Sequence, residues 1–219
     1  MERYFILDKF NTWYDWRLIL TAKNIAFAEP KTNLVELDGM SGSLDLSEVL
    51  TGEITFENRV ITASFWTNNG TYQEREKLLR DVTVAIHGKK IKVVEPDDPD
   101  HYFLGRAKIT AKNNTIPYLV FTIEINCEPW RYAVSEANRT VEVRNENIPT
   151  YVIIRNTGVK TLIPEITVNG LVTIKYNDIT TTLTYGTYKI PDIKLKQGVN
   201  SIEVSGDGSV TFKYREADL

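Results

Sequence analysis

The segment that decides the fold is TYQEREKLLRDVTVAIHG, residues 71–88. Thr71 and Glu74 match the Thr-x-x-Glu capping box, in which each side chain binds a backbone N–H left unpaired at a helix start. Apolar residues then recur at helical spacing, and Gly88 suits the left-handed position after a last turn. The apolar stripe is Leu78, Leu79, Val82 and Ile86. The residues expected to face water are Gln73, Arg75, Glu76, Lys77, Arg80 and Asp81. The segment therefore predicts one amphipathic helix from Thr71 to His87.

Both flanks of this helix have the pattern of short β-strands. Val, Ile and Thr make up 63 of the 219 residues, and β-branched side chains favour the pleated surface of a sheet. Alternating apolar residues between turn signals locate the strands. The predicted strands are 4–7, 17–22, 34–37, 54–57, 59–66, 91–94, 102–110, 118–126, 151–155, 165–168, 172–176, 180–185, 193–195, 201–204 and 210–214. The second half of the chain is expected to turn at Gln197-Gly198 and at Gly206-Asp207-Gly208.

The chain is expected to form two domains. Pro129 is predicted to end a long strand, and the polar residues 131–138 are predicted to connect the domains. We therefore predict a first domain over residues 1–132, a β-sandwich or barrel-like fold with one α-helix. Residues 133–219 are predicted to form a second β-sandwich or jelly roll, because strict alternation gives each sheet one buried and one solvated face. The predicted fold class is mainly β.

Composition argues against several classes of function. The formal charge is −3 and basic residues are scattered, so we expect no sequence-specific nucleic-acid binding and no binding to anionic membranes. The start MERYFILDKF lacks the apolar core of a signal peptide, and no run approaches the ~18 apolar residues of a membrane span. The protein is therefore expected to be made in a cytoplasm. The one cysteine, Cys127, lies on an apolar strand face and is expected to be a buried, inert thiol.

No catalytic or metal-binding pattern stands out. His87 and His101 lie on different predicted elements and lack metal-ligand spacing. The acidic turn, residues 95–100, contains two prolines and lacks EF-hand spacing, so a solvated hairpin tip is favoured over a calcium site. No nucleophile elbow, phosphate loop or dinucleotide motif occurs. We expect a protein that is not an enzyme and binds no cofactor or metal.

Two groups of aromatic residues could serve either in binding or in packing. Trp13, Tyr14 and Trp16 cluster near the N-terminus, where they could form an interface or pack in the core. In the second domain, Tyr176, Tyr185 and Tyr188 could form a sugar-binding platform or serve as ordinary sandwich residues.

Several motifs, taken in order, resemble one known family. They are the glycine-rich turn LDGMSGSLDL (37–46), the pair Asn58-Arg59, the helix with its Gly88 stop, the basic strand 89–92, PDDPDHYFLGR (96–106) and CEPW (127–130). Together they cover most of residues 1–132 and resemble the first domain of distal tail proteins of bacteriophages with long, non-contractile tails. The later residues, with Asn156-Thr157-Gly158 and Pro164-Glu165-Ile166, are similar to that family's galectin-like second domain.

The resemblance implies a structural role at the tail tip of a phage, prophage or tailocin. It implies a ring of first domains, usually a hexamer, between the tail tube protein and the hub or tail-associated protein, with receptor-binding proteins as further partners. The candidate interface residues are Trp13, Trp16, Arg75 and Arg80. Two other hypotheses remain: a carbohydrate-binding module that recognises cell-wall glycans, and, disfavoured, a tail-associated hydrolase.

Overall fold

The computed structural model describes residues 4–219, except for the side chains of Glu146 and Asn147. The chain divides into two compact units, one built on the residues up to Arg131 and one on Tyr132–Asp218. Both are built from β-sheets, and the whole described chain contains one α-helix. The predicted fold class, mainly β with a single helix, is confirmed.

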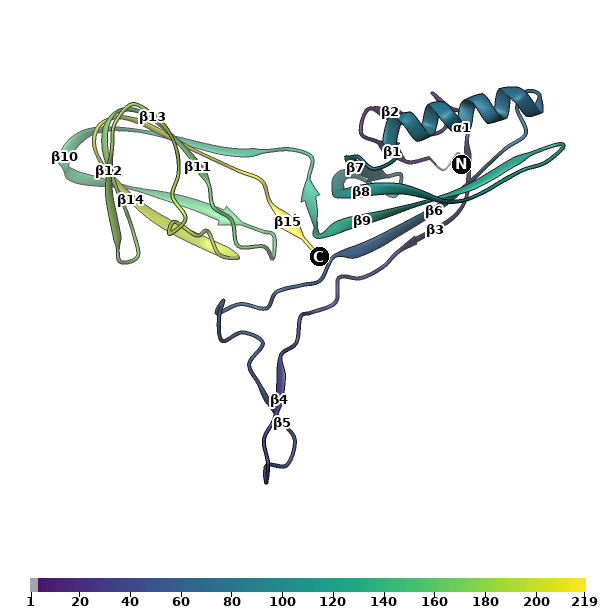
Figure 1. Cartoon of the computed structure of the whole chain (residues 1–219). Helices are drawn as coiled ribbons and strands as arrows, with labels where there is room; N and C mark the ends of the chain where they lie inside the picture. Colours follow the sequence, from purple (N-terminus) through teal and green to yellow (C-terminus); the bar gives the residue numbers. More distant parts are fainter. Residues whose placement is uncertain (1–3) are drawn as a thin grey trace. The chain divides into compact units, whose positions relative to one another are not determined.

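The first unit is built on one antiparallel sheet with the strand order β2-β1-β7-β8-β9-β6-β3 (Figure 1). Its strands are β1 (Ile6–Leu7), β2 (Phe10–Asn11), β3 (Ile19–Ile25), β6 (Arg59–Thr67), β7 (Lys90–Glu95), β8 (Asp98–Asn114) and β9 (Leu119–Ala133). β7 and β8 form a hairpin whose tip is Pro96-Asp97, as the acidic turn predicted. Between β3 and β6 the chain leaves this sheet and forms a separate hairpin, β4 (Leu34–Glu36) and β5 (Ser43–Asp45).

The helix α1 (Tyr72–Ile86) begins and ends where its sequence predicted. Thr71 is the N-cap, and both hydrogen bonds of the capping box with Glu74 are present. After the last turn, Gly88 takes a φ of +76°, a left-handed conformation that glycine adopts without strain. Because caps and stop are local signals, they fix the element without help from the rest of the fold.

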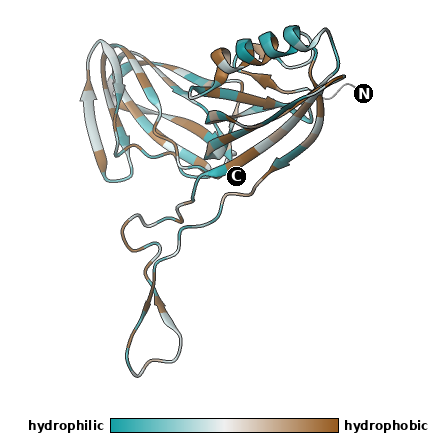
Figure 2. Ribbon diagram, turned by 45° about the vertical axis from the view of Figure 1, so that its right-hand side comes forward, coloured by the Kyte–Doolittle hydropathy of each residue, from teal (hydrophilic) through white to brown (hydrophobic). Residues whose placement is uncertain are grey.

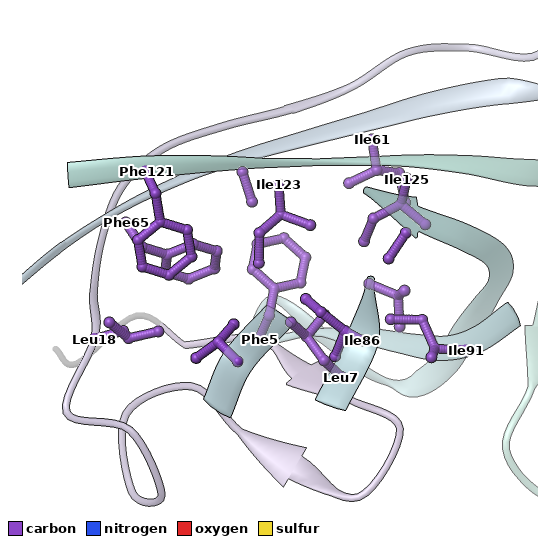
Figure 3. Close-up of a cluster of buried hydrophobic side chains, with 14 of the residues drawn as sticks. Phe5, Leu7, Leu18, Ile61, Phe65, Ile86, Ile91, Phe121, Ile123 and Ile125 are labelled. Atoms are coloured by element: carbon purple, nitrogen blue, oxygen red, sulfur yellow. The ribbon is translucent and has the colours of Figure 1, made fainter. Parts of the chain in front are cut away.

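The core of the first unit is enclosed by the curled sheet, in which β1 and β7 face β6 and β9, and by the helix. Figure 3 shows the side chains of Ile61, Phe65, Phe121, Ile123 and Ile125 facing those of Phe5, Leu7, Ile86 and Ile91. β6 and β9 supply every second residue to this core, and their register places Phe65 beside Phe121 and Ile61 beside Ile125. The period of two in the sequence is the direct cause of this buried face.

The strand β9 continues through Pro129, where the sequence predicted a break. Its pairing with β6 ends at Arg59 and Cys127, two residues earlier. Beyond that point no β6 residue needs an N–H donor from β9, so the proline costs no hydrogen bond on that side. Residues 54–57 were predicted to form a strand but do not. They contribute only an isolated bridge between Phe56 and Pro30.

The second unit has a sheet of five antiparallel strands with the order β10-β14-β11-β12, and β13 also pairs with β11. The strands are β10 (Ala137–Asn156), β11 (Glu165–Tyr176), β12 (Ile179–Leu183), β13 (Gly186–Lys189) and β14 (Gly198–Tyr214), followed by the short β15 (Ala217–Asp218). Its own hydrophobic core includes Ile166, Val172, Ile174, Ile202, Val204 and Phe212, all fully buried.

The predicted turn at Gly206-Asp207-Gly208 is wrong. These residues lie inside β14, which runs unbroken from Gly198 to Tyr214 and pairs with both β10 and β11. The glycines are required by close approach instead: a Cβ on Gly206 would lie 2.2 Å from the Leu171 carbonyl oxygen. For the same reason the two strands predicted at 165–168 and 172–176 are the single strand β11, with Gly170 in its middle.

Among residues 4–219, the helix α1 is not long and apolar enough to cross a membrane.

Candidate assembly surface

The segment between β3 and β6, residues 26–58, is here called the arm. Figure 2 shows hydrophobic residues along the arm, among more polar ones. Phe27 is 90% exposed and Leu50 is 95% exposed. The other large apolar side chains of the arm that lie open to solvent are Leu34, Leu37, Met40, Leu44, Val49 and Ile54. A concentration of exposed apolar side chains of this size is typical of an interaction surface.

The arm holds its shape mainly through local hydrogen bonds. The N–H of Leu46 donates to the carbonyl of Asn33 (2.8 Å), and the N–H of Asn33 donates to Ser47 Oγ (2.8 Å). The side chain and N–H of Ser47 donate to the Asp45 carboxylate and lower its pKa. Backbone pairing of β4 with β5 completes the hairpin. The arm is therefore ordered by its own turns, while its apolar side chains remain available.

The arm and the rest of the first unit carry opposite charge. The arm has seven carboxylates and one lysine, Lys31, a formal charge of −6. The remaining residues of 1–131 have fifteen Lys and Arg against twelve Asp and Glu, a formal charge of +3. Charges of opposite sign on two parts of one chain favour contact between copies, because each copy offers both partners of the interaction.

The structure separates the four predicted interface residues into two surface and two buried positions. Arg80 is exposed on α1, and Trp13 is half-buried with the Arg17 guanidinium 5.9 Å from its ring centroid. Trp16 is buried and stacks on Phe10, with ring centroids 4.9 Å apart. Arg75 is buried as well. The structure does not bring the tryptophans and the helix arginines together into one surface.

The expectation that Arg75 faces water is wrong. Its guanidinium donates to the Gly70 carbonyl (2.6 Å), the Thr115 carbonyl (2.9 Å) and Asn114 Oδ1 (3.1 Å). Helical spacing predicts that Arg75 is buried, because it lies four residues before Leu79 and so extends the apolar stripe by one turn. Its charge argued against burial, since a buried arginine is uncommon without a partner.

A second buried arginine, Arg59, lies at the root of the arm and was missed as a special position. It is 5% exposed, and within the described residues its Nε and Nη2 make no hydrogen bond. Its guanidinium lies 5.3 Å from the ring centroid of Phe103, a cation–π contact. Burial lowers the pKa of this guanidinium, and the nearby Arg131 lowers it further. Two of the three guanidinium nitrogens of Arg59 are thus buried without a hydrogen bond where the arm joins β6.

The three tyrosines considered for sugar binding do not form one platform. Tyr176 is buried, and its hydroxyl lies 2.7 Å from Asn200 Oδ1 and 2.9 Å from the Lys194 carbonyl oxygen, two acceptors within reach of its single proton. Tyr188 is partly buried against the core, and its hydroxyl lies 3.2 Å from the Thr184 carbonyl oxygen. Tyr185 alone of the three is exposed, at 74%.

The two histidines and the cysteine considered for chemistry are hydrogen-bonded or buried within the fold. His87 Nδ1 accepts from the N–H of Ile109 (3.1 Å), and His101 Nδ1 lies 2.7 Å from the Asp98 carboxylate, which also binds Arg131. Cys127 is buried, and burial raises the pKa of its thiol to about 12. Across the described residues, no group of three or more His, Cys, Asp and Glu side chains could hold a metal ion.

Comparison with known proteins gives a match in structure but not in sequence. No protein-family model matches the chain, and no curated protein sequence matches it. Among solved structures, it is similar to the Dit protein (gp 19.1) of phage SPP1, described as a paradigm of the hub adsorption apparatus in phages that infect Gram-positive bacteria. The TM-score is 0.75 at 13% sequence identity, with 99% of each chain covered. The resemblance to distal tail proteins in the sequence is thus confirmed at the level of the fold, which the chain shares over its whole length.

Proposed function

We propose that this chain is a structural protein of a phage tail tip. It forms a hexameric ring that joins the tail tube protein to the hub or tail-associated protein and to receptor-binding proteins. It is made in the host cytoplasm and is located at the tail tip of the virion, and the proposal assigns it no catalytic activity. The observation that supports it is the shared fold, because a match over 99% of both chains includes both units.

The arm supports the self-association in this proposal. Its apolar side chains are exposed in a single copy, and its charge of −6 is complementary to the +3 of the rest of the first unit. Contact of the arm of one copy with the body of the next is head-to-tail, and head-to-tail contacts generate closed rings when the rotation closes. Arg80 and Trp13 are each proposed to contact the neighbour, at separate places, while the buried Arg75 and Trp16 are proposed to have a structural role within the first unit.

The test is assembly of the full chain. Light scattering after size-exclusion chromatography and negative-stain electron microscopy would be applied to the chain alone and with candidate tail tube and hub proteins from the same phage or prophage. We expect rings, alone or with these partners. The double variant Val49→Ser with Leu50→Ser should lose them, because it removes exposed apolar area without touching the core.

The matched control is Tyr151→Ser with Ile153→Ser, two exposed apolar residues of the second unit. This variant should assemble like the unmodified chain. Absence of rings and complexes in every mixture would contradict the proposed function. Rings that persist in the arm variant, with circular dichroism unchanged, would contradict the role of the arm alone.

A further inference from the structure

The hairpin of β8 and β9 ends in a tip, residues 115–118, that lies beyond the start of α1. β8 runs along the helix. At the C-terminal end of α1 the N–H of Ile109 donates to His87 Nδ1 (3.1 Å), and at its first turn Asn114 Nδ2 donates to the Tyr72 carbonyl (3.3 Å). Figure 1 shows the hairpin extending past that first turn. The tip therefore projects from the first unit at one end of α1.

The tip is held in place by the buried Arg75. Its guanidinium donates to Asn114 Oδ1 (3.1 Å) and to the Thr115 carbonyl (2.9 Å), and the N–H of Thr115 donates to the Tyr118 carbonyl (2.8 Å). At the end of this braced turn, Ile116 is 84% exposed. An apolar side chain on a preorganised turn loses little conformational freedom on binding, as an interface anchor requires.

A recess of about 480 Å³ lies at the other end of α1. Part of its lining is apolar: Phe10 and Ala85 are partly buried against the core, and Ile91 is buried. Val84, in the last turn of α1, also lines the recess and is 75% exposed. In a single copy the recess is thus a partly apolar hollow that is open to water.

The charges at the two ends of α1 are complementary. Three lysines and two aspartates line the recess, and within residues 4–219 Lys9 and Lys89 form no ion pair. Lys9 Nζ lies 5.2 Å from the ring centroid of Phe10, and Lys89 Nζ donates to a helix carbonyl (2.7 Å). At the tip's end of α1, hydrogen bonds from Thr71 lower the pKa of Glu74, so its exposed carboxylate is ionised. Contact between the two ends would bring this carboxylate toward ammonium groups.

We propose that the tip of one copy inserts Ile116 into the recess of the next copy. The inference rests on the proposed function, because it names one contact of the ring. The tip and the recess lie at opposite ends of α1, so each copy offers the tip to one neighbour and the recess to the other. Such a head-to-tail contact closes into a ring when the rotation closes. It is separate from the contact proposed for the arm.

The test is disulfide trapping in rings of the full chain that carries Ile116→Cys with Val84→Cys. A disulfide needs Cα atoms within about 7 Å, whereas residues 75 and 84 of α1 alone are about 14 Å apart, so the bond forms only between copies. We expect oxidation to give a ladder of covalent oligomers on a non-reducing gel. Each single variant should give dimers at most, because the native Cys127 is buried.

The matched control is Ile116→Cys with Lys77→Cys. Lys77 is exposed on α1, seven residues before Val84, and so lies on the same side of the helix but about 10 Å away. This pair should give no ladder. Ile116→Ser should weaken self-association by about tenfold in sedimentation velocity, because it removes the apolar anchor. The thermal midpoint of each variant shows whether it is folded.

Two results would overturn the inference: rings of the Ile116→Cys, Val84→Cys variant that oxidise without a ladder, or equal ladders from this pair and the Lys77→Cys control. Either result leaves the proposed function standing, because rings are still observed. Absence of rings from the unmodified chain in every mixture would contradict both the inference and the proposed function.

Discussion

At the scale of single residues, two buried arginines on the same unit have opposite energetic roles. Arg75 donates three hydrogen bonds to neutral acceptors, and these compensate part of the cost of burying its charge. Arg59 is buried too, but its Nε and Nη2 make no hydrogen bond to any described residue. A buried charge without a partner destabilises the folded chain. The pair thus allows one substitution to be tested in two environments.

Arg75→Met should lower the free energy of unfolding by about 3 kcal/mol, because it leaves two carbonyls and an amide oxygen without their donor. Arg59→Met should raise it by about 1 kcal/mol, because it keeps an apolar side chain against Phe103 and removes a charge of which two nitrogens are buried without a hydrogen bond. Denaturation in urea measures both. Arg80→Met, at an exposed position on the same helix, is the control and should change stability by less than about 0.5 kcal/mol. A loss of stability in Arg59→Met would show that the charge has a partner.

Cys127 gives the stability a dependence on pH. Burial raises the pKa of its thiol from 9.0 to about 12, so the folded chain keeps a proton that the unfolded chain releases above pH 9. Stability therefore falls as pH rises between 9 and 12. Cys127→Ala should make the decline from pH 9 to pH 10.5 shallower, whatever its own cost in packing. Equal slopes for the variant and the unmodified chain would contradict the assignment.

The thiol should also be unreactive. At pH 8, labelling of the folded chain by iodoacetamide is expected to proceed only through opening of the core, because the thiolate is the nucleophile and it is scarce in a buried site. Mass spectrometry with and without urea measures the difference. Rapid labelling of the folded chain would show that Cys127 is accessible.

At the scale of elements, what could be predicted was local. The helix was predicted to within a residue because its cap, stripe and stop all lie within residues 71–88. The strands β6 and β9 followed from alternation, but their pairing with each other did not. The misassigned turn at 206–208 shows the limit: glycine marks both turns and close strand approaches, and only the pairing with β11 decides between them. The exposure of the arm could not be predicted either, because the spacing of its apolar residues resembles that of a buried strand.

Gly206→Ala should test the requirement for close approach. The added Cβ would meet the Leu171 carbonyl oxygen at 2.2 Å, so we expect a loss of about 3 kcal/mol in unfolding free energy. Gly198→Ala is the matched control. Gly198 also has positive φ, +98°, but a Cβ there has open space, so the cost should be limited to backbone strain of about 1 kcal/mol. Equal losses would indicate that φ alone explains both glycines.

At the scale of the whole molecule, the candidate site was only partly predictable. Arg80 is exposed and Trp13 is half-buried, whereas the arm was identified in sequence only as two predicted strands, 34–37 and 54–57, and a glycine-rich family motif. Composition also concealed it. The net charge of −3 is the small difference between an acidic arm, a basic body and a second unit in which acids and bases balance.

Self-association should therefore weaken with salt. Raising ionic strength from about 0.05 to 0.5 M shortens the Debye length to a few ångströms, which screens the attraction between arm and body. The double variant Glu36→Lys with Asp38→Lys should weaken association by about tenfold at low salt. Sedimentation velocity measures both, with Glu142→Lys in the second unit as control. Association that is insensitive to salt and to charge reversal would leave apolar contact as the sole cause.

The position of the arm also bears on how such a protein can diversify. β3 and β6, the strands on either side of it, are hydrogen-bonded neighbours, so the body of the first unit closes whatever lies between Ile25 and Arg59. Lengthening a loop costs little, about 0.6 kcal/mol for each doubling. The arm is thus an exchangeable cassette: recombination could replace it with a segment of another length or charge, changing the neighbour it recognises while the sheet beneath is inherited intact.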